Sequence, residues 1–176
     1  MKNDITEKMK KMFGYTNSLA VPKVEKIVIN VGVGRLSQQP NFEEKVLPVI
    51  VKELAVITGQ KPVMTKAKKS IAGFKTRAGQ IVGLKVSLRR KRKEDFLGKL
   101  VHVVLPRLRD FRGIDPHAVD ASGNLHIGLR DYLVFPEINP EESKVDFGME
   151  ISIVNTAKKR DEALELYKLI GIPFKK

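Results

Sequence analysis

The 176-residue chain contains no cysteine and no long apolar run. Without cysteine, neither disulfide bonds nor thiolate metal sites are available. The longest apolar runs, VLPVIV and VVLP, are too short to span a bilayer, and the N-terminal segment MKNDITEKMKKMF carries scattered charge where a signal peptide has an apolar core. We therefore expect a soluble, cytoplasmic protein without a membrane partner.

Acidic residues are also absent from one long stretch, residues 54–93. This stretch holds twelve of the 33 Lys and Arg residues and accounts for twelve of the thirteen net positive charges of the chain. A surface that serves only solubility normally mixes both signs, because neighbouring like charges repel each other. We therefore expect an anionic partner to neutralise this segment.

Two segments alternate between apolar and polar residues as half-buried strands do. Residues 81–89 place Val82, Leu84, Val86 and Leu88 on one side and a basic face, with Lys85, Ser87 and Arg89, on the other. Residues 24–33 alternate in the same way, with Ile27, Ile29, Val31 and Val33 on the apolar side. Asn30 thus lies mid-strand on the less apolar face. It is either an ordinary solvated residue or has a partner outside the protein.

Periodicity and end signals predict the other elements. The segment 41–59 is expected to be a helix with Asn41 as N-cap, Glu44 in the capping-box position and Gly59 as terminator, and Pro48 must be absorbed near its first turns or kink it. Pro106 should distort the end of a second helix. Further helices are expected at 94–111, 157–171 and 4–14, and a strand at 145–154.

Strands and helices mix without strict βαβ alternation, which favours an α+β fold. We expect a single domain over residues 1–176, with an antiparallel sheet and helices packed on one face. Residues 61–69 should be extended, and about residues 70–80 should form a long basic loop that leads into the strand at 81–89. Phe74 in this loop either folds back onto the protein as an anchor or stacks on a base of a nucleic acid.

Signals for catalysis are weak. GVGRL has two of the three glycines of a dinucleotide fingerprint, the three histidines lack metal-ligand spacing, and Asp115, Asp120 and Asp131 lie among turn residues that commonly bond the backbone. We expect no enzyme activity, no cofactor and no metal.

A regulator that binds acidic proteins or membrane surfaces remains an alternative, although membrane binding favours an amphipathic basic helix. A phosphotransfer enzyme or nuclease would need carboxylates or histidines near the basic segment, which has none.

Several segments, in order, resemble the family of the fifth protein of the large ribosomal subunit, which binds 5S rRNA. They are VEKIVINVGVG, ITGQKPVMTKAKKSIAGFKTRAGQIVGLKVSLR, LPRLRDFRGI, GNLHIGL and VFPEI. The resemblance covers nearly the whole chain. It implies a compact α+β domain, loosely like an RNA recognition motif but without that motif's aromatic signature, located in the central protuberance of the ribosome.

The resemblance also implies which residues contact 5S rRNA. Asn30, Gln60, Phe74 and Ser87 match the family's contact positions, and Ser87 stands where the family usually has threonine. Basic and polar neighbours and the outward face of the strand at 81–89 complete the expected set, which adds Lys61, Thr65, Lys66, Lys68, Lys69, Lys85 and Arg89.

The loop resembles the family's arm toward the peptidyl-site tRNA. The expected contact residues are Ser70, Ile71, Gly73, Lys75, Thr76, Arg77, Gly79 and Gln80. Other implied partners are the 23S-type rRNA of the large subunit, neighbouring central-protuberance proteins, and a head protein of the small subunit, which would be reached through residues 136–146. The implied function is that of a non-catalytic structural protein of the large subunit.

Overall fold

The fold is built on five antiparallel strands. The computed structural model describes residues 2–141, 143 and 145–175. The strands form one sheet in the order β2-β3-β1-β5-β4, so that β1 pairs with both β3 and β5. This arrangement confirms the predicted α+β class. The strands are β1 (Val24–Gly32), β2 (Val63–Lys66), β3 (Ile81–Leu88), β4 (Leu125–Leu129) and β5 (Met149–Asn155).

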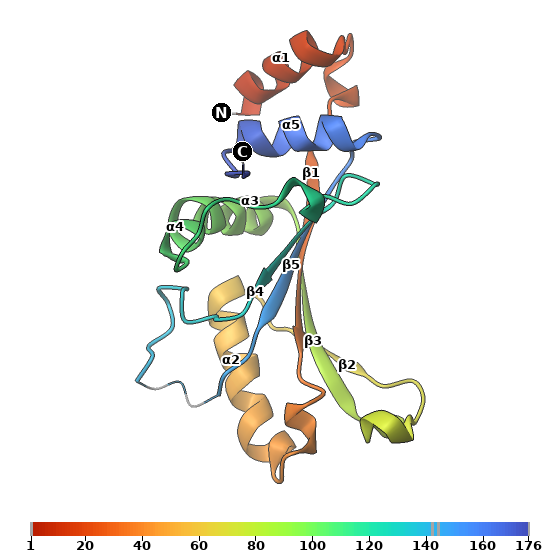
Figure 1. The fold of residues 1–176 in the computed structure, drawn as a ribbon, viewed down its shortest axis with the longest axis vertical. Helices are drawn as coiled ribbons and strands as arrows, with labels where there is room; N and C mark the ends of the chain where they lie inside the picture. The colour runs from red at the N-terminus through yellow and green to blue at the C-terminus, as the bar shows by residue number, and fades with distance from the viewer. Residues whose placement is uncertain (1, 142, 144, 176) are drawn as a thin grey trace.

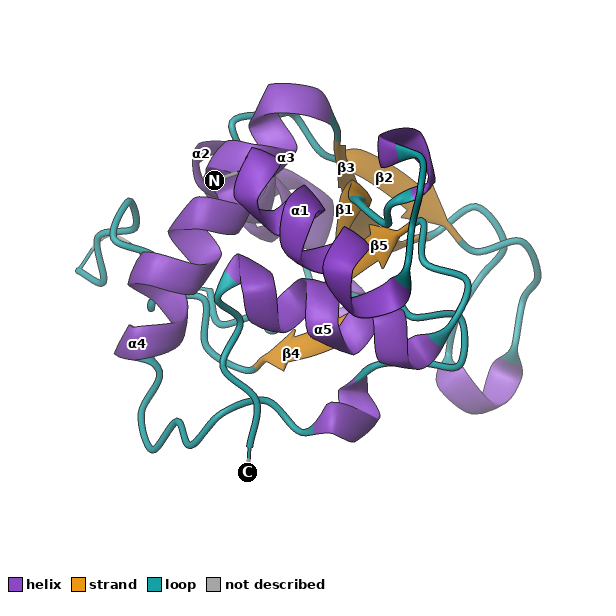
Figure 2. Cartoon of the chain, turned by 90° about the horizontal axis from the view of Figure 1, so that it is seen from above, coloured by secondary structure: helices purple, strands orange, loops and turns teal. Residues whose placement is uncertain are grey.

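Helices cover one face of this sheet. In Figure 1, α2, α3 and α4 lie along one side of the strands, whereas β2 and the loop that follows it extend to the other side. Near the end of the sheet where β1 begins, α5 crosses the strands and α1 packs against α5, as Figures 1 and 2 show. The helices are α1 (Lys2–Phe13), α2 (Leu47–Thr58), α3 (Arg90–Lys99), α4 (Leu105–Arg107) and α5 (Arg160–Ile170).

The core lies between the sheet and the helical layer. Side chains at alternate strand positions point inward and are fully buried, as the period of two requires. They pack against Ile50 and Leu54 of α2 and against the helical segment that follows α3. The inward strand residues include Ile27, Ile29, Val31, Leu84, Val86, Leu88, Ile151 and Ile153. None of the described helices is long and apolar enough to cross a membrane.

Pro48 and Pro106 both modify their helices as expected. A π-helical turn, Phe42–Val46, runs directly into α2, where the Leu47 amide donates to the Phe42 carbonyl oxygen, and Pro48 follows as the second residue of α2. A second π-helical turn, Leu100–Val104, joins α3 to α4, which contains Pro106 and ends at Arg107. Short 3-10 turns occur at Ser18–Ala20, Leu36–Gln38, Ala72–Phe74 and Pro116–Ala118.

The predicted C-termini of α2 and α5 are confirmed, and the predicted N-cap of α2 is wrong. Gly59 and Gly171 terminate α2 and α5 in the left-handed conformation, with φ of 65° and 99°, which confirms the predicted C-termini. The N-cap prediction for Asn41 is wrong: its backbone is itself left-handed, with φ of 58°, and its side chain caps no amide. Asn41 tolerates this conformation better than most residues, and Glu44 therefore makes no capping box.

The connection between β4 and β5 is tied to the core by aromatic side chains. The rings of Tyr132 and Phe147 stack with centroids 3.8 Å apart, and the Tyr132 hydroxyl donates to the Val145 carbonyl oxygen over 2.6 Å. Residues 145–148 therefore belong to this connection, although their alternation predicted that the strand begins at 145. β5 begins at Met149, where pairing with Leu129 starts.

A buried polar network joins α5 to the sheet. The Tyr167 hydroxyl lies 3.0 Å from the Gly123 carbonyl oxygen and 2.9 Å from that of Ile153, and Asn155 Nδ2 donates to Tyr167 Oη and to the Gly123 carbonyl. Tyr167 is fully buried, and burial raises its pKa to about 12. Buried polar groups without partners destabilise a fold, so each of these groups depends on the others.

Replacing Tyr167 with phenylalanine should lower the free energy of unfolding by about 1–3 kcal/mol, because Asn155 and a buried carbonyl lose a partner. Urea denaturation of the full chain measures this loss. Tyr15→Phe is the control at a half-buried tyrosine whose hydroxyl bonds the half-buried Glu162 side chain, and it should cost less than Tyr167→Phe because water can replace that partner. Equal losses for the two variants would contradict the importance of the buried network.

Alkaline pH should destabilise the protein through the same hydroxyl. Because the pKa of Tyr167 is about 12 in the folded chain against 10.0 ordinarily, its stabilising contribution is complete below pH 10 and is lost as the pH rises toward 12. The loss amounts to about 2–3 kcal/mol. Unfolding free energies measured from pH 9 to 12 should fall less steeply in Tyr167→Phe than in the wild type, and parallel curves would contradict this assignment.

Candidate nucleic-acid interface

The open face of the sheet presents a row of polar residues across its strands. Asn30 of β1 is paired with Lys85 of β3 on one side and with Glu150 of β5 on the other. Val28, two residues earlier on β1, is paired with Ser87 and with Ser152. Asn30, Lys85 and Ser87 therefore lie on one surface, as their alternation predicted, and Asn30 is exposed.

Gln60 lies next to this surface, at the end of α2. Its Nε2 donates to the Ser87 carbonyl oxygen over 3.4 Å, and its Oε1 accepts from the Arg92 guanidinium over 3.2 Å. The buried Thr58 hydroxyl also lies 2.9 Å from the Gln60 carbonyl oxygen. The structure thus brings Gln60 and Ser87 together, two residues that are 27 positions apart.

Thr65 contacts β3 at a glycine. It is paired with Gly83, where an added Cβ would lie 2.7 Å from the Thr65 hydroxyl oxygen and 3.3 Å from the Val31 carbonyl oxygen. Glycine at position 83 is therefore what lets the Thr65 side chain lie across β3. Thr65 is half-buried between the exposed Met64 and the exposed Lys66.

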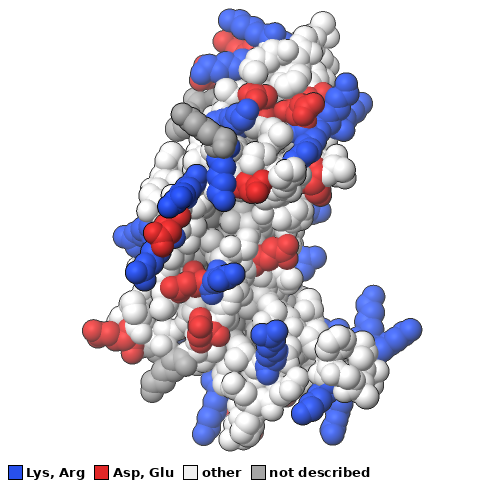
Figure 3. All heavy atoms as spheres, viewed as in Figure 1, with Lys and Arg blue, Asp and Glu red and all other residues white. Residues whose placement is uncertain are grey.

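The β2–β3 region projects from the body as a cationic lobe, defined here as residues 61–80. Figure 3 shows this lobe with Lys and Arg side chains and without Asp or Glu, whereas both signs mix over the rest of the visible face. Its cations are exposed, and among the described residues none has an acidic partner. They are Lys61, Lys66, Lys68, Lys69, Lys75 and Arg77, and Lys85 lies beside them on the sheet.

Residues 70–80 are a structured hairpin end. Ile71 and Thr76 form an isolated bridge, Ala72–Phe74 is a 3-10 turn, and the Ser70 hydroxyl accepts from the Ala78 amide over 2.9 Å. Gly79 has a φ of 86°, which explains a glycine there, whereas Gly73 has no positive φ and gives no sign of a hinge.

Phe74 lies at the end of the lobe with 71% of its surface exposed. The alternative that its ring anchors the loop to the core is therefore wrong. Ile71, 50% exposed, and Val63, 66% exposed, lie on the same lobe. Exposed apolar groups among cations fit a ligand that combines flat rings with phosphates.

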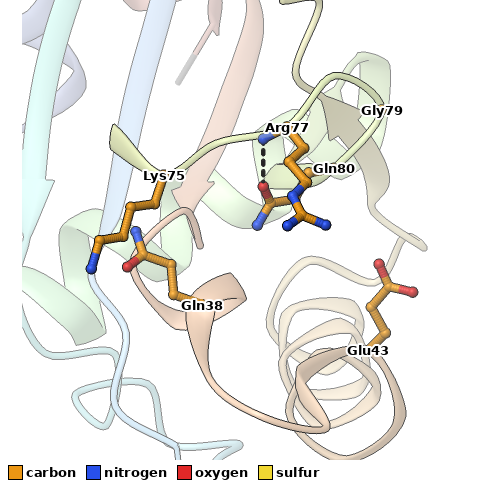
Figure 4. Close-up of a pocket in the computed structure, with 6 residues that line it drawn as sticks. All are labelled: Gln38, Glu43, Lys75, Arg77, Gly79 and Gln80. Atoms are coloured by element: carbon orange, nitrogen blue, oxygen red, sulfur yellow. Dashed lines mark hydrogen bonds between the residues drawn. The ribbon is translucent and has the colours of Figure 1, made fainter. Parts of the chain in front are cut away.

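A cleft separates the loop from the segment that follows β1. Gln38, Glu43, Lys75, Arg77, Gly79 and Gln80 line it, and Figure 4 shows Glu43 on the wall opposite Arg77. The Arg77 amide donates to Gln80 Oε1 over 2.9 Å. Sequence reasoning missed Gln38, because a glutamine in a short turn carries no pattern that predicts a contact 36 residues away.

Some of the basic side chains in the run from residue 89 to residue 93, at the start of α3, already have partners within the chain. The Arg89 guanidinium lies 3.4 Å from Glu25, an exposed pair that stabilises little. Lys93 donates to the Val24 carbonyl oxygen over 2.7 Å. Arg90 and Lys91 are exposed and have no partner among the described residues, so they extend the cationic surface beyond Ser87. Of the predicted contact residues, Arg89 alone is committed to an acidic side chain within the described chain.

The opposite half of the open face has a different character. His126 of β4 lies 3.0 Å from the Ser152 hydroxyl oxygen and 3.6 Å from Glu150, with Asp120 at 3.5 Å. Asp120 also accepts from the Asn124 amide over 2.8 Å, and Asp131 accepts from the Leu133 amide. These aspartates serve turns, as predicted, and hydrogen bonds from Asn124 hold the pKa of Asp120 below its usual range despite partial burial.

Two family models match nearly the whole chain. The model of ribosomal protein L5 matches residues 17–77, and the model of the C-terminus of the same ribosomal family matches residues 81–174. The chain belongs to the ribosomal protein L5 family. Strands of both matched segments share the sheet, because β1 lies between β3 and β5.

Full-length relatives agree with this assignment. The chain is 50% identical to the large ribosomal subunit protein uL5 of Halothermothrix orenii over 98% of its length and 94% of the relative. It is 49% identical to that of Carboxydothermus hydrogenoformans over 98% and 94%, and 51% identical to that of Thermosipho africanus over 99% and 94%.

Membership decides several predictions at once. The resemblance seen in the sequence is confirmed, and the chain is a structural, non-enzymatic constituent of the large ribosomal subunit, located in the cytoplasmic ribosome and associated with rRNA. The phosphotransfer enzyme and nuclease alternatives are therefore excluded.

Proposed function

We propose that the chain binds 5S rRNA with the cationic lobe and with the β3–β1 half of the open sheet face, and holds it in the central protuberance against the 23S-type rRNA. The observation that carries this proposal is the continuity of the two surfaces. Lys85 of β3 is paired with Asn30 of β1 on one side and with Val63 of β2 on the other, so β3 joins the polar row of the sheet to the lobe, which includes β2. A folded scaffold thus presents unpaired cations next to fixed hydrogen-bonding groups.

The two kinds of residue have different roles. Each unpaired Lys or Arg that neutralises a phosphate releases counterions, which supplies affinity without regard to sequence. Asn30, Gln60 and Ser87 are placed by strand register and by the end of α2, so they orient the RNA through hydrogen bonds to ribose, base or phosphate. Phe74 stacks on a base at the end of the lobe.

The remaining proposed contacts rest on the family resemblance, and the shape of the molecule is consistent with them. The 70–80 loop lies at the far end of the lobe, from which it reaches the peptidyl-site tRNA with Lys75 and Arg77. The segment 136–146 belongs to the β4–β5 connection and contacts a head protein of the small subunit. Within it, Glu142 and Lys144 lie outside the described residues. Neighbouring central-protuberance proteins complete the set of partners.

Binding of the full chain to transcribed bacterial 5S rRNA should weaken steeply with salt. If about five of the seven unpaired cations of the lobe and of β3 contact phosphates, the logarithm of the association constant should fall against the logarithm of salt concentration with a slope steeper than about −3. Filter binding or fluorescence anisotropy between 50 and 300 mM KCl measures the slope.

A polyglutamate chain of matched charge is the control ligand for this titration. It tests binding to any polyanion and should bind more weakly than 5S rRNA at every salt concentration, because it lacks riboses and bases for Asn30 and Phe74. A flat salt response with 5S rRNA, or equal affinity for polyglutamate, would contradict the proposal.

Phe74→Ala should weaken binding of 5S rRNA by about tenfold, the effect of losing one stacked base. It should leave the melting temperature nearly unchanged, since the ring is exposed. Leu19→Ala is the matched control, because Leu19 is also exposed, at 82%, and lies in the 3-10 turn between α1 and β1, away from the lobe. Loss of stability without loss of RNA affinity in Phe74→Ala would refute the stacking role.

A further inference from the structure

Two glutamine side chains fasten the 70–80 loop to the turn that follows β1. Gln80 Nε2 donates to the Ser37 hydroxyl oxygen over 2.9 Å and approaches the Ser37 carbonyl oxygen at 3.4 Å. Gln38 Nε2 donates to the Phe74 carbonyl oxygen over 3.2 Å. Among the described residues, these are the only hydrogen bonds that join the loop to a part of the chain outside the β2–β3 hairpin.

The turn that receives the loop is itself attached to the sheet. The Ser37 hydroxyl donates to the Gly34 carbonyl oxygen over 2.8 Å, and the Ser37 amide donates to the Val33 carbonyl oxygen over 2.8 Å. The Val33 amide in turn donates to the carbonyl oxygen of Val82, a residue of β3, over 3.0 Å. Ser37 is therefore a fixed point relative to the strands that carry Asn30 and Lys85.

Gln80 connects this fixed point to the inside of the loop. While its Nε2 bonds Ser37, its Oε1 accepts from the Arg77 amide over 2.9 Å. Gln38 holds another part of the loop: its Nε2 donates to the carbonyl oxygen of Phe74, the residue whose ring is proposed to stack. Figure 4 shows Gln38 and Gln80 at the cleft from opposite sides, one from the turn and one from the loop.

We infer that Ser37, Gln38 and Gln80 are positioning residues, which hold the loop in its RNA-binding conformation before RNA arrives. This inference rests on the proposed function of the loop and goes beyond it. A ligand that binds one loop conformation loses apparent affinity in proportion to the fraction of molecules outside that conformation. Hydrogen bonds that order the loop in the free protein therefore raise affinity without touching the RNA.

The double variant Ser37→Ala/Gln38→Ala tests this inference and leaves every residue of the loop unchanged. In the free full-length protein, amide hydrogen exchange at residues 71–79 should become about tenfold faster, as expected for the loss of two hydrogen bonds of ordinary net strength. Affinity for transcribed 5S rRNA should fall several-fold, and by no more than the factor measured in exchange. Amides of β5 report in the same experiment that the fold is intact.

Gln39→Ala is the matched control, since Gln39 is exposed and its side chain makes no hydrogen bond within the described chain. It should change neither exchange nor affinity. If the double variant unfolds, Gln38→Ala alone replaces it, because Gln38 is exposed and its truncation removes only the contact to Phe74.

The outcomes separate this inference from the proposed function. Unchanged exchange at 71–79 in the variant overturns the positioning role. Faster exchange with unchanged RNA affinity also overturns it, provided that Phe74→Ala does weaken binding. If neither variant weakens binding, the proposed role of the loop in binding 5S rRNA is wrong, and with it the inference. Faster exchange together with weaker RNA binding, neither seen in Gln39→Ala, supports the inference.

Discussion

The pairing of β1 with strands on both sides is the constraint on which the interface depends. Because side chains alternate along a strand, a shift of one residue would turn Asn30 into the core and Ile29 out to the surface. The apolar side of β1 is fully buried against the helical layer, so such a shift would expose several core residues. The hydrophobic core thus determines that Asn30, Lys85 and Ser87 face outward together on the open side of the sheet, as the proposed RNA contact requires.

Charge repulsion within the cationic lobe destabilises the folded protein, and the way the scaffold holds the lobe away from the body limits this effect. Like charges that lie close together repel each other, and the lobe contains no acid to relieve them. Extension from the body spreads its side chains into water, where screening is strong, and β3 supplies the attachment through antiparallel pairing with β2. In the proposed complex, RNA phosphates neutralise the lobe, and the relief of its charge repulsion adds to the binding free energy.

Local signals predicted most of the fold and the polar part of the site, and contacts between distant residues escaped. The strands β1 and β3 were readable because one face is apolar, and the ends of α2 and α5 because glycine favours the left-handed conformation. The N-cap prediction for Asn41 failed because asparagine favours both the N-cap position and the left-handed backbone conformation. The contacts of Gln80 with Ser37 span 43 positions, and no periodicity encodes them, so the order of the loop was invisible in the sequence.

The open face changes character across β1, which bears on how RNA lies there. On one side Asn30 has Lys85 as its neighbour, and on the other it has Glu150, beyond which lie His126 and Asp120. A phosphate over β5 would meet acidic oxygens, whereas one over β3 meets unpaired cations. In the proposed complex the RNA backbone therefore runs along β3 and β2, and Asn30 lies at its border. The amide at this border carries no charge and can both donate and accept hydrogen bonds, which suits a position between fields of opposite sign.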